Sequence, residues 1–281
     1  MTIGIIGLGL IGASLAAAIH ENTYDSVLGL DINENTMRAA LGQRTVDGAL
    51  SQVNIATCDM IIIALYPRTA IQVLGEIAPY VKKGTIVVDC CGIKRPICAE
   101  GKKLAAQYGF TFIGGHPMAG RECWGYESAK ADMYKGASMI LTPDPEEAKV
   151  TVSCVSDYFL SLGFARITKV TPEEHDEIIA CTSQLAHVLS SSYIRSETAA
   201  KHEGLSAGSF RDMTRVAALN DRMWSEIFLD NKDNLLSEID GLIRHLQEYR
   251  NAIAKDDRET ISELMRDSTH KRAVYFHNQM I

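Results

Sequence analysis

The chain has no apolar run of the roughly 20 residues that a helix needs to span a bilayer. Its apolar start, Ile3 to Ala18, lacks a basic leading segment and runs into polar residues. We therefore interpret it as a strand, a turn and a helix, and not as a signal peptide. The chain also lacks an excess of positive charge, because the formal net charge is −7 at pH 7. We expect neither a membrane nor a nucleic acid as a partner.

Cysteine occurs, but never in a pattern typical of a metal site or a disulfide framework. The seven cysteines are scattered and odd in number, and no two of them form a Cys-X-X-Cys pair. No clustered histidine and aspartate ligands accompany them, so we expect no metal. Reduced thiols of this kind are typical of a cytoplasmic protein, and this is the location we predict.

Short apolar runs alternate with helical patterns through about residue 169, in a chain with the ordinary globular content of 46% hydrophobic residues. This alternation predicts an α/β fold, a Rossmann-type doubly wound parallel sheet with helices on both faces. The predicted strands are Ile3–Ile6, Val27–Leu30, Met60–Leu65, Thr85–Val88, Thr111–Ile113, Ser138–Thr142 and Ala165–Ile167. The predicted helices between them are Ile11–His20, Glu34–Leu41, Thr69–Val81, Ala99–Tyr108 and Pro145–Leu162.

The pattern becomes wholly helical after Thr171. The sequence Thr-Pro-Glu-Glu at residues 171–174 has an N-cap threonine, a proline at the first helical position and a glutamate at the third, as in a capping box. Apolar residues then recur at steps of three and four from Leu235 to Ile253, which predicts a long amphipathic helix. We predict a Rossmann domain at residues 1–169 and an all-α domain at residues 170–281.

Residues 7–12 read Gly-Leu-Gly-Leu-Ile-Gly, between a predicted strand and a predicted helix. In a dinucleotide-binding turn Gly7 makes the tight turn, Gly9 lets the backbone approach the pyrophosphate, and Gly12 permits close packing of helix on strand. Leu10 and Ile11 open the helix, whose N-terminal N–H groups attract phosphate. We predict that these five residues bind NAD. The alternative is a glycine-rich turn that binds no cofactor.

Asp31 ends the next predicted strand, at the usual distance of about 20 residues from the glycines. A carboxylate there accepts hydrogen bonds from the adenosine ribose and repels a 2′-phosphate, so we predict NAD and not NADP. We interpret Arg38, on the following helix, as a surface residue.

His116 lies in Gly-Gly-His-Pro-Met-Ala-Gly, residues 114–120, in a predicted loop after the fifth strand. Ligands bind beyond the carboxyl ends of the strands of such sheets, so His116 is expected to face the nicotinamide end of the crevice. Its ordinary pKa lies near operating pH, which suits a general base.

The glycine motif, this histidine motif, a helical segment Thr182 to His187 and the sequence Gly-Ser-Phe-Arg-Asp-Met-Thr-Arg at residues 208–215 occur in this order. Together they resemble the prephenate dehydrogenase family of tyrosine biosynthesis, the TyrA family, over nearly the whole chain. The resemblance implies an NAD-dependent oxidoreductase that converts prephenate to 4-hydroxyphenylpyruvate by oxidative decarboxylation. It implies that His116 accepts the proton of the ring hydroxyl, and that the helical domain dimerises.

The resemblance also implies substrate-binding residues in the helical domain. Arg215 aligns with the arginine that binds the substrate carboxylate, which a guanidinium grips bidentately. His187 aligns with a substrate-binding histidine, and Ser183 lies four residues before it on the same helix face. Gly208 would permit close approach, and Trp224 matches a position near the site. For His187 and Trp224 the alternative is a packing role in the core.

This chain departs from the family at Gly92, where members usually have a serine beside the catalytic histidine. Losing one orienting hydrogen bond costs about 1–3 kcal/mol, and we expect water, Cys91 or another side chain to compensate. Gln184 and Ala186 are also departures, in the segment Ser-Gln-Leu-Ala-His.

Two further arginines, Arg121 and Arg211, belong to these motifs. Arg121 would add a positive charge near the site and alter substrate preference. For Arg211 we favour a surface role over carboxylate binding.

Three alternatives to a prephenate dehydrogenase stay open on the sequence. Arogenate dehydrogenase shares the chemistry but takes an amino substrate. A 3-hydroxyacid or imine-type dehydrogenase shares the layout but usually relies on a lysine in the helical domain. An NAD-binding sensor without turnover is suggested by Gly92, although such a protein has no need of His116, His187 and Arg215 together.

The apolar stripe of the long helix has to be buried, and a partner subunit would do so in this family. We therefore predict a homodimer. Because the sequence ends at residue 281, soon after the predicted helical domain, we expect no fused regulatory or chorismate mutase domain.

Overall fold

The computed structural model describes residues 1–120 and 123–276. By the contacts between its residues the chain divides into two compact units, residues 1–231 and residues 232–281. The first unit holds the sheet, its flanking helices and the helices up to Asp230. The second holds two long helices.

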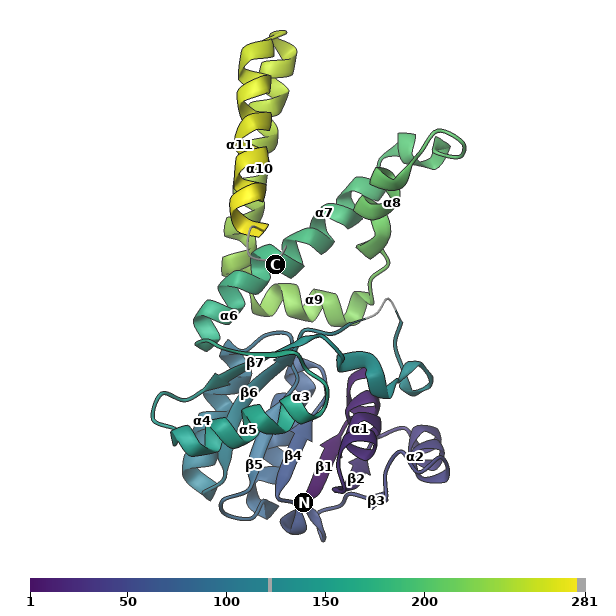
Figure 1. Ribbon diagram of the computed structural model, residues 1–281, viewed down its shortest axis with the longest axis vertical. Helices are drawn as coiled ribbons and strands as arrows, with labels where there is room; N and C mark the ends of the chain where they lie inside the picture. Colours follow the sequence, from purple (N-terminus) through teal and green to yellow (C-terminus); the bar gives the residue numbers. More distant parts are fainter. Residues whose placement is uncertain (121–122, 277–281) are drawn as a thin grey trace. The chain divides into compact units, whose positions relative to one another are not determined.

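An eight-stranded sheet forms the centre of the first unit, in the order β3-β2-β1-β4-β5-β6-β7-β8 (Figure 1). Its strands are β1 (Thr2–Ile6), β2 (Ser26–Leu30), β3 (Gly48–Ala49), β4 (Met60–Ile63), β5 (Ile86–Asp89), β6 (Thr111–Pro117), β7 (Ser138–Pro143) and β8 (Arg166–Lys169). The pairing is parallel throughout, save for the antiparallel pair β6 and β7. The order 3-2-1-4-5-6 of the first six strands is that of a dinucleotide-binding sheet, which confirms the predicted fold class.

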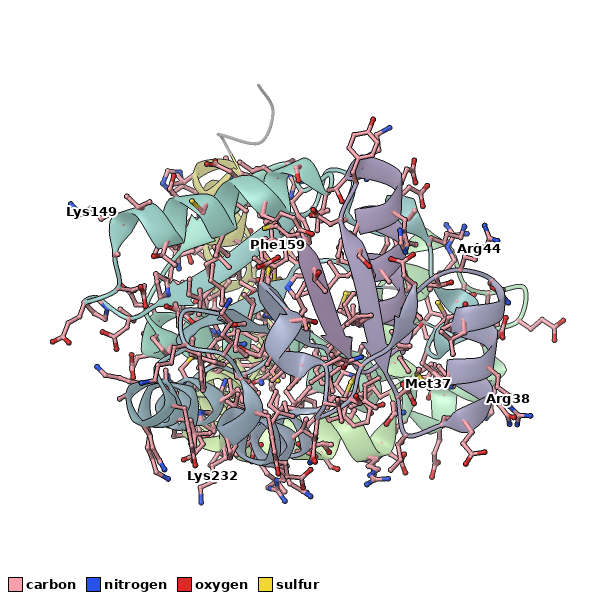
Figure 2. The ribbon with its side chains drawn as sticks, turned by 90° about the horizontal axis from the view of Figure 1, so that it is seen from below. Met37, Arg38, Arg44, Lys149, Phe159 and Lys232 are labelled. Carbon is pink, nitrogen blue, oxygen red and sulfur yellow. The ribbon has the colours of Figure 1, made fainter. Side chains whose placement is uncertain are left out.

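Helices cover both faces of the sheet because successive strand residues point to opposite sides. Ile62 packs in a core with the first, second and fifth helices, and Ile61 packs in a second core with the third and fourth. Each fully buried isoleucine contributes about 1.5–3 kcal/mol. In Figure 2, Phe159 lies inside the first of these cores and Arg38 lies at the periphery, as the sequence predicted. These helices are α1 (Leu10–Asn22), α2 (Glu34–Gly42), α3 (Pro67–Ile77), α4 (Arg95–Tyr108) and α5 (Lys149–Ser161).

The structure corrects the prediction that His116 lies in a loop. Strand β6 continues through His116 to Pro117 because β7 pairs with it antiparallel, with His116 opposite Ile140. The short strand β3 was also not predicted. The catalytic candidate therefore sits on a hydrogen-bonded strand, which holds its backbone more firmly than a loop would.

The helices that follow the sheet begin where the capping-box pattern predicted. Thr171 Oγ1 accepts the N–H of Glu174, and the Glu174 carboxylate accepts the N–H of Thr171. Within this run the chain makes a π-helical turn, η5, of a kind frequent at functional sites. The elements are α6 (Pro172–Ile179), η5 (Ala180–Gln184), α7 (Leu185–Ile194), α8 (Gly208–Thr214), η7 (Arg215–Ala217) and α9 (Asp221–Asp230).

The second unit consists of α10 (Lys232–Ala254) and α11 (Arg258–Phe276), which lie side by side (Figure 1). The long amphipathic helix predicted from the sequence is α10. Several of its apolar side chains are more than half exposed in the single chain: Leu236, Ile243, Leu246 and Ile253. Among all described residues, no helix combines the length and the apolar character needed to cross a membrane.

Candidate active site

The glycine turn between β1 and α1 has the geometry that a dinucleotide requires. Gly7 has a φ of +91°, and a Cβ there would lie 2.5 Å from the carbonyl oxygen of Ala64. A Cβ at Gly12 would lie 1.9 Å from the carbonyl oxygen of Gly7, so helix and turn meet at a distance that only glycine permits. A Cβ at Gly9 would meet no atom within 4 Å. The open space at Gly9 is where a phosphate can approach the backbone.

The N-terminus of α1 is suited to an anion. Gly9 is its N-cap and supplies no side-chain hydrogen bond, and the first turn carries no acidic residue. The N–H groups of the first helical turn and the helix dipole therefore favour a negatively charged group at this end. Leu10 and Ile11, the first two residues of α1, line a large cavity beside the turn.

Asp31 lies directly beyond β2 and next to the glycine turn. Its Oδ2 accepts the N–H of Leu8 at 2.8 Å, and its Oδ1 accepts the N–H of Asn33 at 2.8 Å. These bonds fix a half-buried carboxylate beside the start of α1. The position is the one from which a carboxylate binds an adenosine ribose.

A cavity of about 600 Å³ opens at the carboxyl ends of β1, β4, β5 and β6 and is closed by residues of η5, α7, η7 and α9. It lies wholly within the first unit. The predicted site residues that line it are Gly9, Leu10, Ile11, His116, Ser183, His187, Arg215 and Trp224. A second cavity, of about 420 Å³ beside α4, contains none of the predicted residues.

His116 is held from one side of its ring by a second histidine. Its Nδ1 lies 2.9 Å from Nε2 of His175, and Nδ1 of His175 lies 2.7 Å from Oδ1 of Asp176. His175 and Asp176 are buried at the start of α6. Burial, together with the nearby His175 and Lys94, holds the pKa of His116 well below its ordinary value. His116 is therefore a neutral imidazole at physiological pH.

Asp176 connects this chain of hydrogen bonds to the start of α4. Its Oδ1 accepts the N–H of Lys94 at 2.7 Å, and its Oδ2 accepts the N–H of Arg95 at 3.0 Å and Nε–H at 3.2 Å. Burial opposes its charge, but the bonds from His175 and the two backbone N–H groups lower the pKa of Asp176 below its ordinary value. It is an anion at physiological pH.

A buried ion pair braces the strand that carries His116. Lys94 Nζ pairs with the carboxylate of Asp89 and donates to the carbonyl oxygen of Gly115 at 2.5 Å. Asp89 also accepts the N–H of Gly115 and the N–H of Cys91. Burial acts against the charge on Lys94, but the Asp89 carboxylate outweighs it and the pKa of Lys94 is raised. The pair thereby ties the end of β5 to the residue before His116.

Of the compensating groups expected for Gly92, the structure places another side chain, that of His175, on the ring of His116. A Cβ at Gly92 would lie 3.8 Å from Nε2 of His116, so a serine there would reach the ring nitrogen that faces the cavity. The group that holds the ring is instead His175, on the opposite nitrogen. Cys91 does not compensate, because its Sγ lies 3.6 Å from the carbonyl oxygen of Leu65.

His187 and Trp224 meet on the helical wall of the cavity. Their ring centroids are 3.9 Å apart, and His187 Nδ1 lies 3.0 Å from the carbonyl oxygen of Val216. Ser183 lines the same wall, as its four-residue spacing from His187 predicted. Gln184 is buried and accepts a hydrogen bond from Asn231 at 3.0 Å. This departure from the family segment therefore ties η5 to the end of α9.

The arginine motif is brought to the cavity only in part. Arg215, in η7, lines the cavity, whereas Arg211 is an exposed residue of α8. Gly208 does not line the cavity, and a Cβ there would meet only Nη2 of Arg211, at 4.0 Å. Arg121 lies outside the described residues.

Sequence reasoning missed His175, Asp176, Asp89 and Lys94. The available signal was a single lysine and a single aspartate within an otherwise apolar stretch, and a His-Asp pair directly after the helix cap. Among the described residues, no three His, Cys, Asp or Glu side chains gather as a metal site would require.

A dinucleotide-type sheet, a glycine turn at an uncapped helix N-terminus and a neutral imidazole in the adjoining cavity are together the features of a nucleotide-dependent oxidoreductase. The family model for the prephenate dehydrogenase nucleotide-binding domain matches residues 15–169, and the model for the prephenate dehydrogenase dimerization domain matches residues 171–267. The chain therefore belongs to the prephenate dehydrogenase family.

Individual relatives agree with this assignment. The chain is similar to a cyclohexadienyl dehydrogenase of Zymomonas mobilis, 31% identical over 96% of this chain and 94% of the relative. It also resembles the crystal structure of Synechocystis arogenate dehydrogenase, at 26% identity and a TM-score of 0.83, covering 98% and 100% of the two chains. Aquifex aeolicus prephenate dehydrogenase, solved with hydroxyphenyl propionate and NAD⁺, has the same fold at 24% identity and a TM-score of 0.82, covering 98% of each chain.

Proposed function

We propose that this chain catalyses the NAD-dependent oxidative decarboxylation of prephenate to 4-hydroxyphenylpyruvate, a step of tyrosine biosynthesis. The observation that carries the proposal is the position of His116. A half-buried, neutral imidazole faces a cavity that is also lined by the glycine turn and by Arg215 and His187. A base, a dinucleotide site and an anion-binding arginine in one cavity are what this reaction requires.

The residues present fit NAD. The pyrophosphate would lie over Gly9 and the N-terminus of α1, beside Leu10 and Ile11, with Gly7 and Gly12 shaping the turn. Asp31 would accept hydrogen bonds from the adenosine ribose, and its charge disfavours the 2′-phosphate of NADP. When bound, the nicotinamide supplies the hydride acceptor.

The helical wall would bind the substrate. Arg215 would bind a carboxylate of the substrate, and His187 and Ser183 would hydrogen-bond its polar groups. Trp224 packs against His187 and would fix the orientation of that ring. Gly208 stays a predicted site residue that lies outside the cavity lining.

His116 would take the proton of the ring hydroxyl at Nε2 as hydride leaves the ring carbon. With that proton removed, the hydroxyl oxygen would become a ketone, and a bound nicotinamide would supply the acceptor for the ring hydride. The ring carboxylate would then leave as carbon dioxide. The electron pair of the broken C–C bond completes the aromatic ring, so the step needs no electrophile beyond the ketone that forms.

Arogenate is the second candidate substrate, since the chain is 31% identical to the cyclohexadienyl dehydrogenase above and has the fold of the arogenate dehydrogenase at 26% identity. It differs from prephenate in carrying an amine in place of the side-chain ketone, at a distance from the reacting ring. His116 would act identically on either compound.

We further propose that residues 1–169 and 170–281 are the two functional domains, supported by family matches at residues 15–169 and 171–267. We propose a homodimer, supported by the dimerization-domain match and by the exposed apolar side chains of α10. Light scattering that finds a monomer at working concentrations would contradict the dimer. A cytoplasmic location is supported by the seven cysteines, since no disulfide joins any two of them in the described part of the chain.

The test is NADH formation by the purified protein with NAD or NADP and with prephenate or arogenate as substrate. The proposal predicts turnover with prephenate and a preference for NAD. Turnover with arogenate but not prephenate would show that arogenate is the substrate and would leave the proposed reaction unchanged. Binding of NAD without reaction of either compound would overturn the proposed function.

A further inference from the structure

The hydrogen-bonded chain from His116 through His175 to Asp176 is not accounted for by binding of cofactor or substrate. His175 is 1% exposed and Asp176 is fully buried, and neither of them lines the cavity. A polar chain of this kind costs free energy unless every member is satisfied. Each hydrogen bond in it must therefore join one donor to one acceptor, and this requirement determines the protonation state of each member.

Asp176 is the fixed end of the chain. Both of its oxygens accept hydrogen bonds from backbone N–H groups, and Arg95 adds an Nε–H donor. An anion with these three donors holds its charge, so the fourth donor, Nδ1 of His175 at 2.7 Å, carries a proton. Neutral histidine has one protonated nitrogen, so Nε2 of His175 is an acceptor.

That assignment determines the tautomer of the next ring. Nε2 of His175 can accept only from a protonated Nδ1 of His116, 2.9 Å away. His116 then carries its one proton on Nδ1, and its Nε2 has an open lone pair. Gly92 lies on the Nε2 side of the ring and lines the cavity, so this lone pair faces the site.

We propose that His175 and Asp176 are positioning residues that fix His116 in the Nδ1–H tautomer, so that Nε2 accepts the substrate proton. The role of His116 as base rests on the proposed function, but its tautomer does not. As Nε2 accepts the proton, His116 becomes an imidazolium that still donates from Nδ1 to His175. The chain ends on a carboxylate, which stabilises the positive charge that forms.

The charged groups around this chain favour the same arrangement. Lys94 faces the two rings from the start of α4, but Asp89 pairs with it directly. Its positive charge raises the cost of a second protonation in the pair. Burial is the largest cause that lowers the pKa of His175, against a smaller opposing effect of Asp176. Two neutral imidazoles and one carboxylate are therefore the resting state.

The hydrogen bonds from His116 to His175 and Asp176 also explain how the site tolerates Gly92. A serine at residue 92 would contact Nε2 of His116, the nitrogen that receives the proton. It would not contact Nδ1, so it could not fix the ring from that side. His175 holds the ring from the side away from the substrate, so Nε2 is aimed whether or not a hydroxyl is present.

The direct test is ¹⁵N NMR of the protein with ¹⁵N-labelled histidine near pH 7.5, with no cofactor or substrate added. Loss of signals in a His116→Asn variant assigns the ring. We expect the Nδ1–H tautomer for His116, with Nε2 showing the shift of an unprotonated nitrogen. Protonated Nε2 in the wild-type protein would overturn the proposal, whatever the activity.

Two replacements at His175 separate positioning from mere packing. His175→Gln keeps an acceptor for Nδ1–H but breaks the link to Asp176, whereas His175→Leu removes the acceptor. We expect kcat to fall about 10-fold in the first and about 100-fold in the second, with KM for substrate little changed. Equal losses in both variants, or losses confined to KM, would contradict the proposal.

His202→Gln is the matched control, because His202 is an exposed histidine bonded to Ser206 and lies outside the cavity lining. It should alter neither the His116 spectrum nor kcat. Should His175→Leu fail to fold, the wild-type spectrum and His175→Gln still decide. Failure of the proposed function would appear as absent turnover with the predicted tautomer intact, and failure of this inference as turnover with the other tautomer.

Discussion

Lys94 and Asp89 form an ion pair in which both side chains are fully buried, and the same lysine holds the carbonyl of the residue before His116. Breaking such a pair from one side leaves an uncompensated charge in the interior, which costs about 3–5 kcal/mol. Lys94→Met should lower the free energy of unfolding by this amount, measured by urea denaturation.

The matched control for that variant is Lys103→Met. Lys103 pairs with Glu100 on the same helix, but its side chain is 67% exposed. Exposed pairs contribute about 1 kcal/mol or less. Equal losses of unfolding free energy in the two variants would show that the buried ion pair stabilises the protein no more than the exposed one.

Gly92→Ser should fold normally and raise kcat/KM. The nearest atom to a new Cβ is Ile227 Cδ1 at 3.7 Å, an ordinary contact, and the hydroxyl would reach Nε2 of His116 and the substrate hydroxyl. One added hydrogen bond is worth about 1 kcal/mol, or about fivefold in rate. Gly92→Ala adds the Cβ without the hydroxyl and should leave kcat/KM unchanged. A serine variant no better than the alanine variant would contradict this account.

Asp31→Asn should weaken NAD and relieve the exclusion of NADP. The amide keeps one acceptor for the backbone N–H groups but removes the charge that, on the proposed function, would face the ribose. We expect Kd for NAD to rise about 10- to 150-fold, by the roughly 1.5–3 kcal/mol of a hydrogen bond to a charged group, and the ratio of Kd values for NADP and NAD to fall. Fluorescence titration with the reduced cofactors measures both.

Asp47→Asn provides the comparison for Asp31. Asp47 also accepts a backbone N–H, that of Val27, but at the opposite end of β2. It should leave both cofactor affinities unchanged. A similar loss of NAD affinity in the two variants would place the ribose elsewhere.

The pH profile of kcat/KM follows from the lowered pKa of His116. A base acts in its neutral form, which predominates above its pKa, and burial holds that pKa well below 6.5. As pH falls, activity should therefore persist through pH 6.5 and decline only at lower values. An acid limb centred at or above pH 6.5 in the profile of the free enzyme would contradict a base that is neutral at physiological pH.

The sheet and the cofactor turn were predictable because their signals are local. Strands separated by helices, the glycines at residues 7–12 and the acid at Asp31 are each encoded within a few residues of one another. The capping box at Thr171 is local in the same way, and its predicted hydrogen bonds are present.

The hydrogen bonds from His116 through His175 to Asp176 were not predictable, because His175 lies 59 residues away from His116 in sequence. The sequence around His175 indicates only the polar start of a helix. Its partner is set by how α6 packs against the start of α4, which no local pattern specifies. The strand at His116 was missed for a similar reason, since β7 supplies its pairing from farther along the chain. The compact first unit likewise extends to Asn231, past the change in pattern at residue 170, because α6 packs against α4, and α7 packs against α8 and η7.

The most direct test of the central claim is steady-state turnover of prephenate with NAD by His116→Asn beside the wild-type protein, with the Kd for NAD measured in both. Asparagine fits the space of the imidazole but cannot act as a base. We predict that kcat falls by about 10²–10⁴-fold while the Kd for NAD changes less than about threefold. Turnover by the variant within tenfold of the wild type would contradict the assignment of His116 as the base.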